Sequence, residues 1–277
     1  MADLETFAQC LTSIANLGAN DIYNWYLAST EPSTTAARPS PPNLKINLIY
    51  PCTPKHIAKY SSQGVRTVTE TPDIYRSHIL PYIERNRADG RLNWVFNILD
   101  GLTEQEDVVY RSPPSNNTDD DFLLLPDLNW DRSTLTSLHL LCLPNRRDLH
   151  SLRDLRPSHL PWLRHLRASV LAATAKLYPA LDFDQLKLYL HYQPTYYHLH
   201  VHVVHVALEA GATQAVGKAW GLETIMEMLE VMGEVEEATG KSGAGMEGLT
   251  MTYGVGEASE LWTEVFEPLK REGQKGV

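Results

Sequence analysis

The sequence has little cysteine, and the few cysteines present do not suggest a disulfide framework. Only three occur in 277 residues, Cys10, Cys52 and Cys142, and they are widely spaced and odd in number. This pattern predicts free thiols in a reducing compartment, which would be the cytoplasm and could include the nucleus. A secretory signal and a long apolar run are also missing, so neither secretion nor a membrane span is predicted.

Basic side chains are in deficit as well. Lysine and arginine total 24 against 34 aspartates and glutamates, which gives a net charge of −10. Such a chain has no broad basic surface, so we expect no long nucleic acid as a partner, and any RNA ligand would be short or bound mainly at its end. The hydrophobic content of 43% is enough for one large domain or two unequal ones.

What the chain does have is a cluster of histidines. Five of the eleven lie between His191 and His205. Apolar and β-branched residues on both sides of Pro194 predict two strands, about 186–191 and 198–208, joined by a turn. Side chains alternate along a strand, so three of these histidines should share one face. The three are His198, His200 and His202.

Three imidazoles on one face can perform nucleophilic and acid–base chemistry. A neutral ring can attack phosphorus, a charged ring can donate a proton, and an ordinary pKa of about 6.5 makes both forms accessible. Metal binding is the alternative, because alternate strand positions can present two or three imidazoles to one ion. Strand parity does not separate these two readings. It does place His205 on the opposite face, where we predict a core residue.

A resemblance separates them. The segment His198-Leu-His-Val-His202-Val-Val resembles the defining motif of the histidine triad superfamily, and His191-Tyr-Gln-Pro-Thr-Tyr-Tyr197 resembles one branch of it, the scavenger mRNA-decapping enzymes. The resemblance implies that His200 is the nucleophile, with His191, His198 and His202 around the phosphates and Tyr196 in the substrate site. It implies neither a metal nor a cofactor.

The same resemblance implies an α+β fold in two domains. A smaller α+β domain would span residues 1–66, and a histidine triad domain, an antiparallel sheet with helices, would span residues 67–277. The break near residues 63–70 is the candidate hinge.

The segment 92–100 predicts a strand that turns at Gly101. It contains Trp-Val-Phe-Asn-Ile-Leu-Asp, which resembles the decapping family closely and implies that Trp94 stacks on the 7-methylguanine base. An indole face attracts a cationic base by about 0.5–2 kcal/mol. Without the resemblance, Trp94 would be read as a core residue.

Polar base contacts are implied downstream. Glu104 matches the carboxylate that accepts hydrogen bonds from the guanine edge, although by composition it belongs to a solvated acidic turn. Asp127 matches a second polar base contact. Asn129 stands where the family has a phosphate-binding lysine, so a charged donor is replaced by a neutral one. His139 stands where relatives usually have tyrosine and is predicted to line the site.

The N-terminal region carries two further matches. Asn20 belongs to an Asn-Asp-Ile-Tyr stretch whose asparagine reaches the cap in the family, and Lys59 belongs to a Lys-Tyr pair that could face the phosphates. Read alone, these are a strand start and a solvated helix lysine. Apolar positions from Leu4 to Leu17 predict a short amphipathic helix. Relatives carry a longer upstream segment, so we expect a fungal-type domain with a shortened N-terminus.

The predicted activity is hydrolysis of the 5′ cap of capped dinucleotides and short capped oligoribonucleotides, the fragments left by 3′-to-5′ mRNA decay. His200 would form a covalent nucleotide intermediate, and the products would be 7-methyl-GMP and a nucleoside diphosphate or 5′-diphosphate RNA. The alternatives are a dinucleoside polyphosphate hydrolase of the same superfamily and a catalytically weak cap-binding protein. We also expect a homodimer, held through the long helix and sheet edge of the larger domain.

Overall fold

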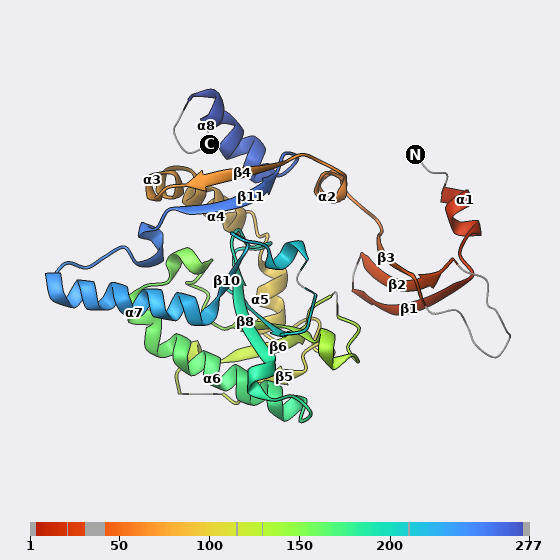
Figure 1. Ribbon diagram of the computed structural model, residues 1–277, viewed down its shortest axis with the longest axis horizontal. Helices are drawn as coiled ribbons and strands as arrows, with labels where there is room; N and C mark the ends of the chain where they lie inside the picture. The colour runs from red at the N-terminus through yellow and green to blue at the C-terminus, as the bar shows by residue number, and fades with distance from the viewer. Residues whose placement is uncertain are drawn as a thin grey trace. The chain divides into compact units, whose positions relative to one another are not determined.

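The computed structural model describes residues 4–20, 22–30, 42–114, 116–128, 130–209 and 211–273. The chain divides into two compact units, residues 1–64 and 65–277, and each is described by itself (Figure 1). Helices and antiparallel sheets occur in both, so the predicted α+β class is confirmed. No helix in the described ranges is long and apolar enough to cross a bilayer.

The first unit is built on one three-stranded antiparallel sheet with the order β1-β2-β3. Its elements are α1 (Leu4–Gln9), β1 (Ser13–Asn20), β2 (Tyr23–Ser29), β3 (Leu44–Ile49) and α2 (Pro54–Tyr60). The helix predicted to run to Leu17 ends at Gln9, and Ile14 pairs with Ala28 across the sheet. Pairing with β2 therefore overrides the helical spacing of the apolar residues.

The second unit is organised around a six-stranded antiparallel sheet with the order β10-β8-β9-β7-β6-β5. The strands are β5 (Tyr110–Arg111), β6 (Phe122–Pro126), β7 (His139–Pro144), β8 (Leu186–His191), β9 (Val201–His205) and β10 (Ala219–Gly221). A second sheet pairs β4 (Val65–Glu70) with β11 (Met251–Gly256). The histidine-bearing strands β7, β8 and β9 are neighbours in this sheet, and the chain passes through a long helix between β7 and β8.

Helices cover this unit and enclose its core. They are α3 (Pro72–Ile74), α4 (Leu80–Ala88), α5 (Asn93–Leu99), α6 (Leu160–Leu177), α7 (Leu222–Thr239) and α8 (Glu267–Arg271), with π-helical turns at Tyr75–Ile79 and Trp262–Phe266. The two long helices α6 and α7 run side by side (Figure 1). Their apolar stripes are buried and ion pairs join their outer faces, for example Arg164 to Glu230 at 2.7 Å.

The segment predicted as a strand at 92–100 is a helix, α5, and that prediction is wrong. Leu92, Val95 and Ile98 are buried, whereas Trp94 is 42% exposed. The buried positions are three residues apart, which is close to the period of a helix. The short run of aromatic and β-branched residues favoured a strand instead. The helix therefore places Trp94 on the face opposite the buried residues Leu92, Val95 and Ile98.

Candidate active site

The histidine segment is only partly a strand. β8 ends at His191 as predicted, but β9 begins at Val201, so His198 and His200 precede it and the predicted start at His198 is wrong. Local hydrogen bonds explain the difference, because the carbonyl of His198 accepts from the side chain of His200 and the ring of His198 donates to the carbonyl of Pro144 at the end of β7. The apolar residues between the histidines are buried, as predicted.

His200 is held in the form a nucleophile needs. Its Nδ1–H donates to the carbonyl of His198 at 2.8 Å, which leaves the lone pair on Nε2. Burial lowers its pKa to about 4, so the ring is neutral at pH 7. The ring of Tyr196 stacks on it at 4.2 Å with an interplanar angle of 17°. This arrangement presents an uncharged, oriented imidazole nitrogen.

His198 and His191 are anchored through backbone carbonyls. His198 Nε2–H donates to Pro144 at 2.8 Å, and His191 Nε2–H donates to Thr213 at 2.7 Å. Burial lowers the pKa of His198 to about 4 and, with help from the charge of Lys218, that of His191 to about 3. The Nδ1 atom of His198 is buried and has no partner within the described part of the chain. An unsatisfied buried polar atom of this kind suggests a ligand site.

His202 forms a hydrogen bond with His139 of the neighbouring strand β7. Its Nδ1 lies 2.9 Å from Nε2 of His139, whose Nδ1 lies 3.7 Å from Oδ1 of Asp127. The ring of Tyr189 stacks on His202 at 4.9 Å, and the ring of His191 lies 4.0 Å away. Burial lowers the pKa of His202 well below its ordinary value. His139 thus lines the site as the sequence predicted, but its hydrogen bond was not foreseen.

One group of side chains could hold a metal ion. Asp127, His139 and His202 each offer a ligand atom, and within the described residues these three atoms all lie within 4.8 Å of one another. Histidine and carboxylate ligands would suit zinc. A metal bound there would have to replace the hydrogen bond between the two rings, and the predicted independence from metal stays a prediction.

Lys218 is the residue whose position the sequence least revealed. It follows Gly217, which has a φ of +77° and whose missing Cβ would lie 2.4 Å from the carbonyl oxygen of Thr252. Its Nζ donates to the carbonyl of Gln193 at 2.5 Å. The charge is close enough to lower the pKa of His191 and His200, after the larger effect of burial. The pairing of β10 with β8 brings this lysine to the histidines.

One of the residues predicted to hold the base, Trp94, lies near the nucleophile. Trp94 meets Tyr196 edge-on at 4.9 Å, and Tyr196 in turn stacks on His200. Glu104 follows α5 in a left-handed backbone conformation with a φ of 52°, which is uncommon for a residue other than glycine. Such strain concentrates at functional sites. Asp127 follows β6 and faces His139, and its predicted contact with the base stays a prediction.

Three predicted site residues are less fully placed. Asn129 lies outside the described residues. Asn20 ends β1 and Lys59 lies in α2, so both belong to the first unit, and only their backbone is described. Their predicted contacts with the cap and the phosphates stay predictions.

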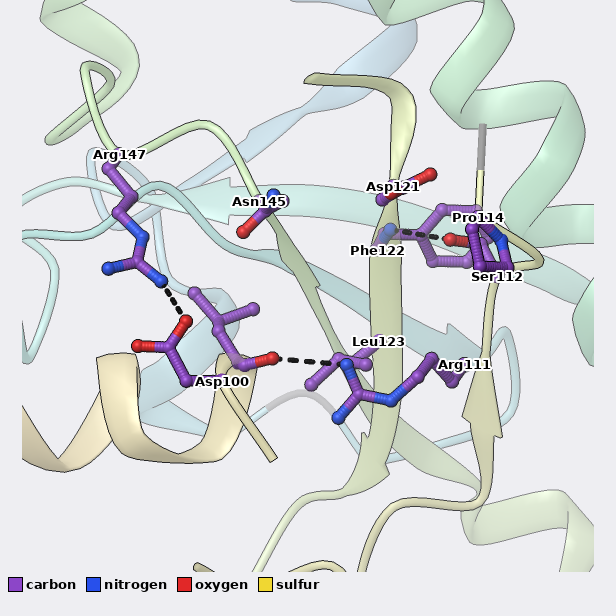
Figure 2. Close-up of a pocket in the computed structure, with 10 residues that line it drawn as sticks. Asp100, Arg111, Ser112, Pro114, Asp121, Phe122, Leu123, Asn145 and Arg147 are labelled. Carbon is purple, nitrogen blue, oxygen red and sulfur yellow. Dashed lines mark hydrogen bonds and ion pairs between the residues drawn. The ribbon is translucent and has the colours of Figure 1, made fainter. Parts of the chain in front are cut away.

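A separate cavity of about 300 Å³ lies near the edge strand β5, and it contains none of the site histidines. Arg147 pairs with Asp100 there, as Figure 2 shows. Arg111 donates to the carbonyl of Leu99 at 3.0 Å. Both cations are therefore engaged, and Asp121 adds a further carboxylate to the lining. We place the reaction at the histidine cluster, because that is where nucleophile and unsatisfied polar atoms meet.

Two family models match the chain. The model described as "Scavenger mRNA decapping enzyme C-term binding" matches residues 93–217, and "Scavenger mRNA decapping enzyme (DcpS) N-terminal" matches residues 1–63.

Proteins named m7GpppX diphosphatase are similar over most of the chain. The relative from Schizosaccharomyces pombe is 36% identical over 266 residues, covering 96% of this chain and 79% of the relative. The one from Ascaris suum is 40% identical, with coverage of 77% and 66%, and the one from Homo sapiens is 37% identical, with coverage of 82% and 64%. The matches thus span about two thirds of the length of these animal relatives. On this evidence the chain belongs to the scavenger mRNA decapping enzyme family.

Proposed function

We propose that this protein hydrolyses the 5′ cap of capped dinucleotides and short capped RNA fragments, as the printed name of its relatives, m7GpppX diphosphatase, suggests. The observation that carries the proposal is the state of His200, a buried neutral imidazole with its Nε2 lone pair left available by the bond from Nδ1–H to His198. A general nucleotide-binding site would not need a histidine fixed in this tautomer.

In the first step, Nε2 of His200 attacks the phosphorus nearest the 7-methylguanosine. A nitrogen–phosphorus bond forms, the phosphoanhydride bond breaks, and the electron pair leaves with the diphosphate. Lys218 supplies positive charge beside the histidines. A surrounding imidazole that becomes protonated next to the phosphates gives its proton to the leaving oxygen, which contributes roughly 10²–10⁴-fold to the rate.

In the second step, water attacks the same phosphorus. The nitrogen–phosphorus bond breaks, 7-methyl-GMP is released, and His200 recovers its lone pair. Division into two displacements replaces one difficult reaction by two easier ones.

Recognition of the methylated base rests on Trp94, Tyr196, Glu104 and Asp127. The exposed indole can stack on a cationic purine, and the two carboxylates can accept hydrogen bonds from its edge. Asn129 adds a neutral donor for the phosphates. Asn20 and Lys59 from the first unit complete the proposed substrate contacts.

We also propose a homodimer, and the first unit supports it. In its described part the buried side chains are few, and many large apolar ones are exposed, including Leu4, Phe7, Ile14, Leu48 and Ile57. A three-stranded sheet with so little apolar cover gains stability from a second chain. Light scattering should give twice the chain mass of 31.2 kDa, and a monomer at micromolar concentration would contradict the proposal.

The activity is tested with a labelled capped dinucleotide, incubated in EDTA. We expect 7-methyl-GMP and a nucleoside diphosphate as products. Loss of activity in the chelator, with recovery on adding zinc, would instead favour a metal at Asp127, His139 and His202. Equal cleavage of a dinucleoside polyphosphate without the methyl group would favour the broader hydrolase of the superfamily.

A further inference from the structure

The ammonium of Lys218 is held by the segment that leads into the histidine triad. Its Nζ donates to the carbonyl of Gln193 at 2.5 Å, and the backbone N–H of Tyr192 donates to the carbonyl of Lys218 at 2.8 Å. The next residue, Ala219, lies opposite His191 in the pairing of β10 with β8. Two consecutive residues that follow His191 therefore fix both the backbone and the side chain of the lysine.

A lysine needs such a restraint if its charge is to act at one place. The ammonium lies at the end of a flexible chain that carries about 2 kcal/mol of rotamer entropy. The carbonyl of Gln193 is neutral, so it accepts from the ammonium without cancelling its charge. Whatever fixes this carbonyl therefore helps to decide where the charge of Lys218 lies.

The side chain of Gln193 is hydrogen-bonded through both of its polar atoms. Nε2 donates to Oε2 of Glu70 and to the hydroxyl of Tyr253, each at 3.0 Å. Oε1 accepts from the hydroxyl of Tyr197 at 3.1 Å. The partners belong to β4, to β11 and to the segment before the triad. A planar amide held on both sides cannot turn freely, and this restrains the backbone of Gln193 as well.

The anchor for Gln193 is itself rigid. Glu70 is fully buried, and its other oxygen, Oε1, accepts from Arg153 Nε at 2.9 Å and from the hydroxyl of Tyr192 at 2.5 Å. It ends β4, which pairs with β11 along its whole length. A chain of contacts thus runs from a buried carboxylate through Gln193 to the ammonium of Lys218.

We propose that Gln193 is a positioning residue that holds the ammonium of Lys218 beside the histidine cluster during cap hydrolysis. The inference rests on the proposed function, in which a fixed cation stabilises the negative charge that develops on the phosphates. Gln193 acts through the lysine. Because the placed charge matters most in the transition state, loss of Gln193 should lower kcat more than it raises KM.

The test is a double-mutant cycle with Gln193→Met and Lys218→Met. Methionine is unbranched like both side chains but lacks the amide and the ammonium. We expect Gln193→Met to lower kcat for a capped dinucleotide by about tenfold and to change KM by less than about threefold. In protein that already carries Lys218→Met, the same change should alter kcat by less than about twofold, because the charge is gone. Losses that multiply independently would overturn the proposal.

Two buried tyrosines give a matched control. The hydroxyl of Tyr197 bonds to Gln193, whereas that of Tyr192 bonds to Glu70. Tyr197→Phe should lower kcat by about threefold, and Tyr192→Phe should keep it within about twofold while lowering the melting temperature. Equal losses of kcat would mean that packing of the whole cluster, and not Gln193, controls the rate. Because Tyr197→Phe removes a single oxygen, it replaces Gln193→Met in the cycle with Lys218→Met if that variant does not fold.

Nitrogen-15 NMR relaxation tests the positioning without substrate. We expect Nζ of Lys218 to be ordered in the wild type and mobile on the nanosecond timescale in Gln193→Met, with the signal assigned by its loss in Lys218→Met. An ammonium that is equally ordered in both proteins would overturn the proposal even if the cap is hydrolysed. A wild-type protein that does not hydrolyse the cap would instead contradict the proposed function, and the NMR comparison would still decide the role of Gln193.

Discussion

Two buried polar clusters in the second unit differ in how completely their atoms are paired. One centres on Glu70 and Arg153, which are 0% and 1% exposed. Both carboxylate oxygens of Glu70 accept hydrogen bonds, including 2.9 Å from Arg153 Nε, 2.5 Å from the hydroxyl of Tyr192 and 2.6 Å from that of Tyr253. Arg153 also donates to the carbonyl of Met246 at 3.0 Å.

The histidine cluster is equally buried but incompletely paired. His198 Nδ1, His202 Nε2 and the hydroxyl of Tyr196 are buried without partners within the described part of the chain. The comparison indicates that the fully hydrogen-bonded cluster around Glu70 and Arg153 stabilises the fold. The histidine cluster, whose buried polar atoms are not all paired, can bind a ligand. Gln193 touches both, because its side chain donates to Glu70 at 3.0 Å and its carbonyl accepts from Lys218.

The largest expected effect is on turnover. His200→Asn should lower cap hydrolysis by more than about 10³-fold, because asparagine cannot form the nitrogen–phosphorus bond. Cap-analogue affinity, measured by calorimetry, should change little. His205→Asn is the matched control and should retain activity, since His205 is buried outside the cluster. Release of 7-methyl-GMP at the wild-type rate by His200→Asn would contradict the assignment of His200 as the nucleophile.

The next effect tests the cluster around Glu70 and Arg153 through stability. Glu70→Gln should lower the free energy of unfolding by roughly 3–5 kcal/mol, because Arg153 would be left buried without its counter-charge. The exposed pair of Glu223 and Arg167 is the control, and Glu223→Gln should cost less than about 1 kcal/mol. Urea unfolding measures both. A cost for Glu70→Gln as small as that of the control would show that burial alone does not distinguish this cluster.

Acid should destabilise the histidine cluster. The folded pKa values of His191, His198 and His200 are about 3, 4 and 4, below the ordinary value of 6.5, so unfolding takes up protons as the pH falls below 6.5. Stability is therefore fully present above pH 6.5 and is lost on the way down toward pH 4. Between pH 7 and 5.5 the loss should be roughly 1 kcal/mol per histidine.

Urea titrations at the two pH values measure this loss, and His191→Asn should make it smaller by about one histidine's share. Stability that is unchanged at pH 5.5 would mean that the rings are not held neutral.

The smallest effect concerns methyl selectivity. Trp94→Ala should weaken binding of a 7-methylated cap by about two- to thirtyfold more than that of an unmethylated cap, because only the methylated base is a cation. Phe183→Ala, which removes another exposed aromatic ring, should leave the ratio of the two affinities unchanged. If Trp94→Ala weakens both caps equally, the indole contributes packing and not charge recognition.

Motif matching predicted more of the site than local patterning predicted of the backbone. The strand ending at His191 and the gathering of the triad histidines could be read from the sequence, because period and motif agree there. The helix at 93–99 could not, since the apolar run of Trp94, Val95 and Phe96 fits a strand as well as a buried helix. Lys218 and the bond between His139 and His202 depend on strand order, which pairs β8 with β10 and β7 with β9. That strand order is set by tertiary packing, and no local sequence pattern predicts it.

The depressed pKa values of the histidines have a consequence for ligand binding. A site that holds neutral imidazoles when empty meets a polyanion when the cap enters, and the anion favours their charged forms. We therefore expect binding to take up protons from solution, so that the apparent heat of binding varies with the ionisation enthalpy of the buffer. By linkage, the affinity for the triphosphate should rise as the pH falls from 7 toward 6, while the free protein loses stability over the same range.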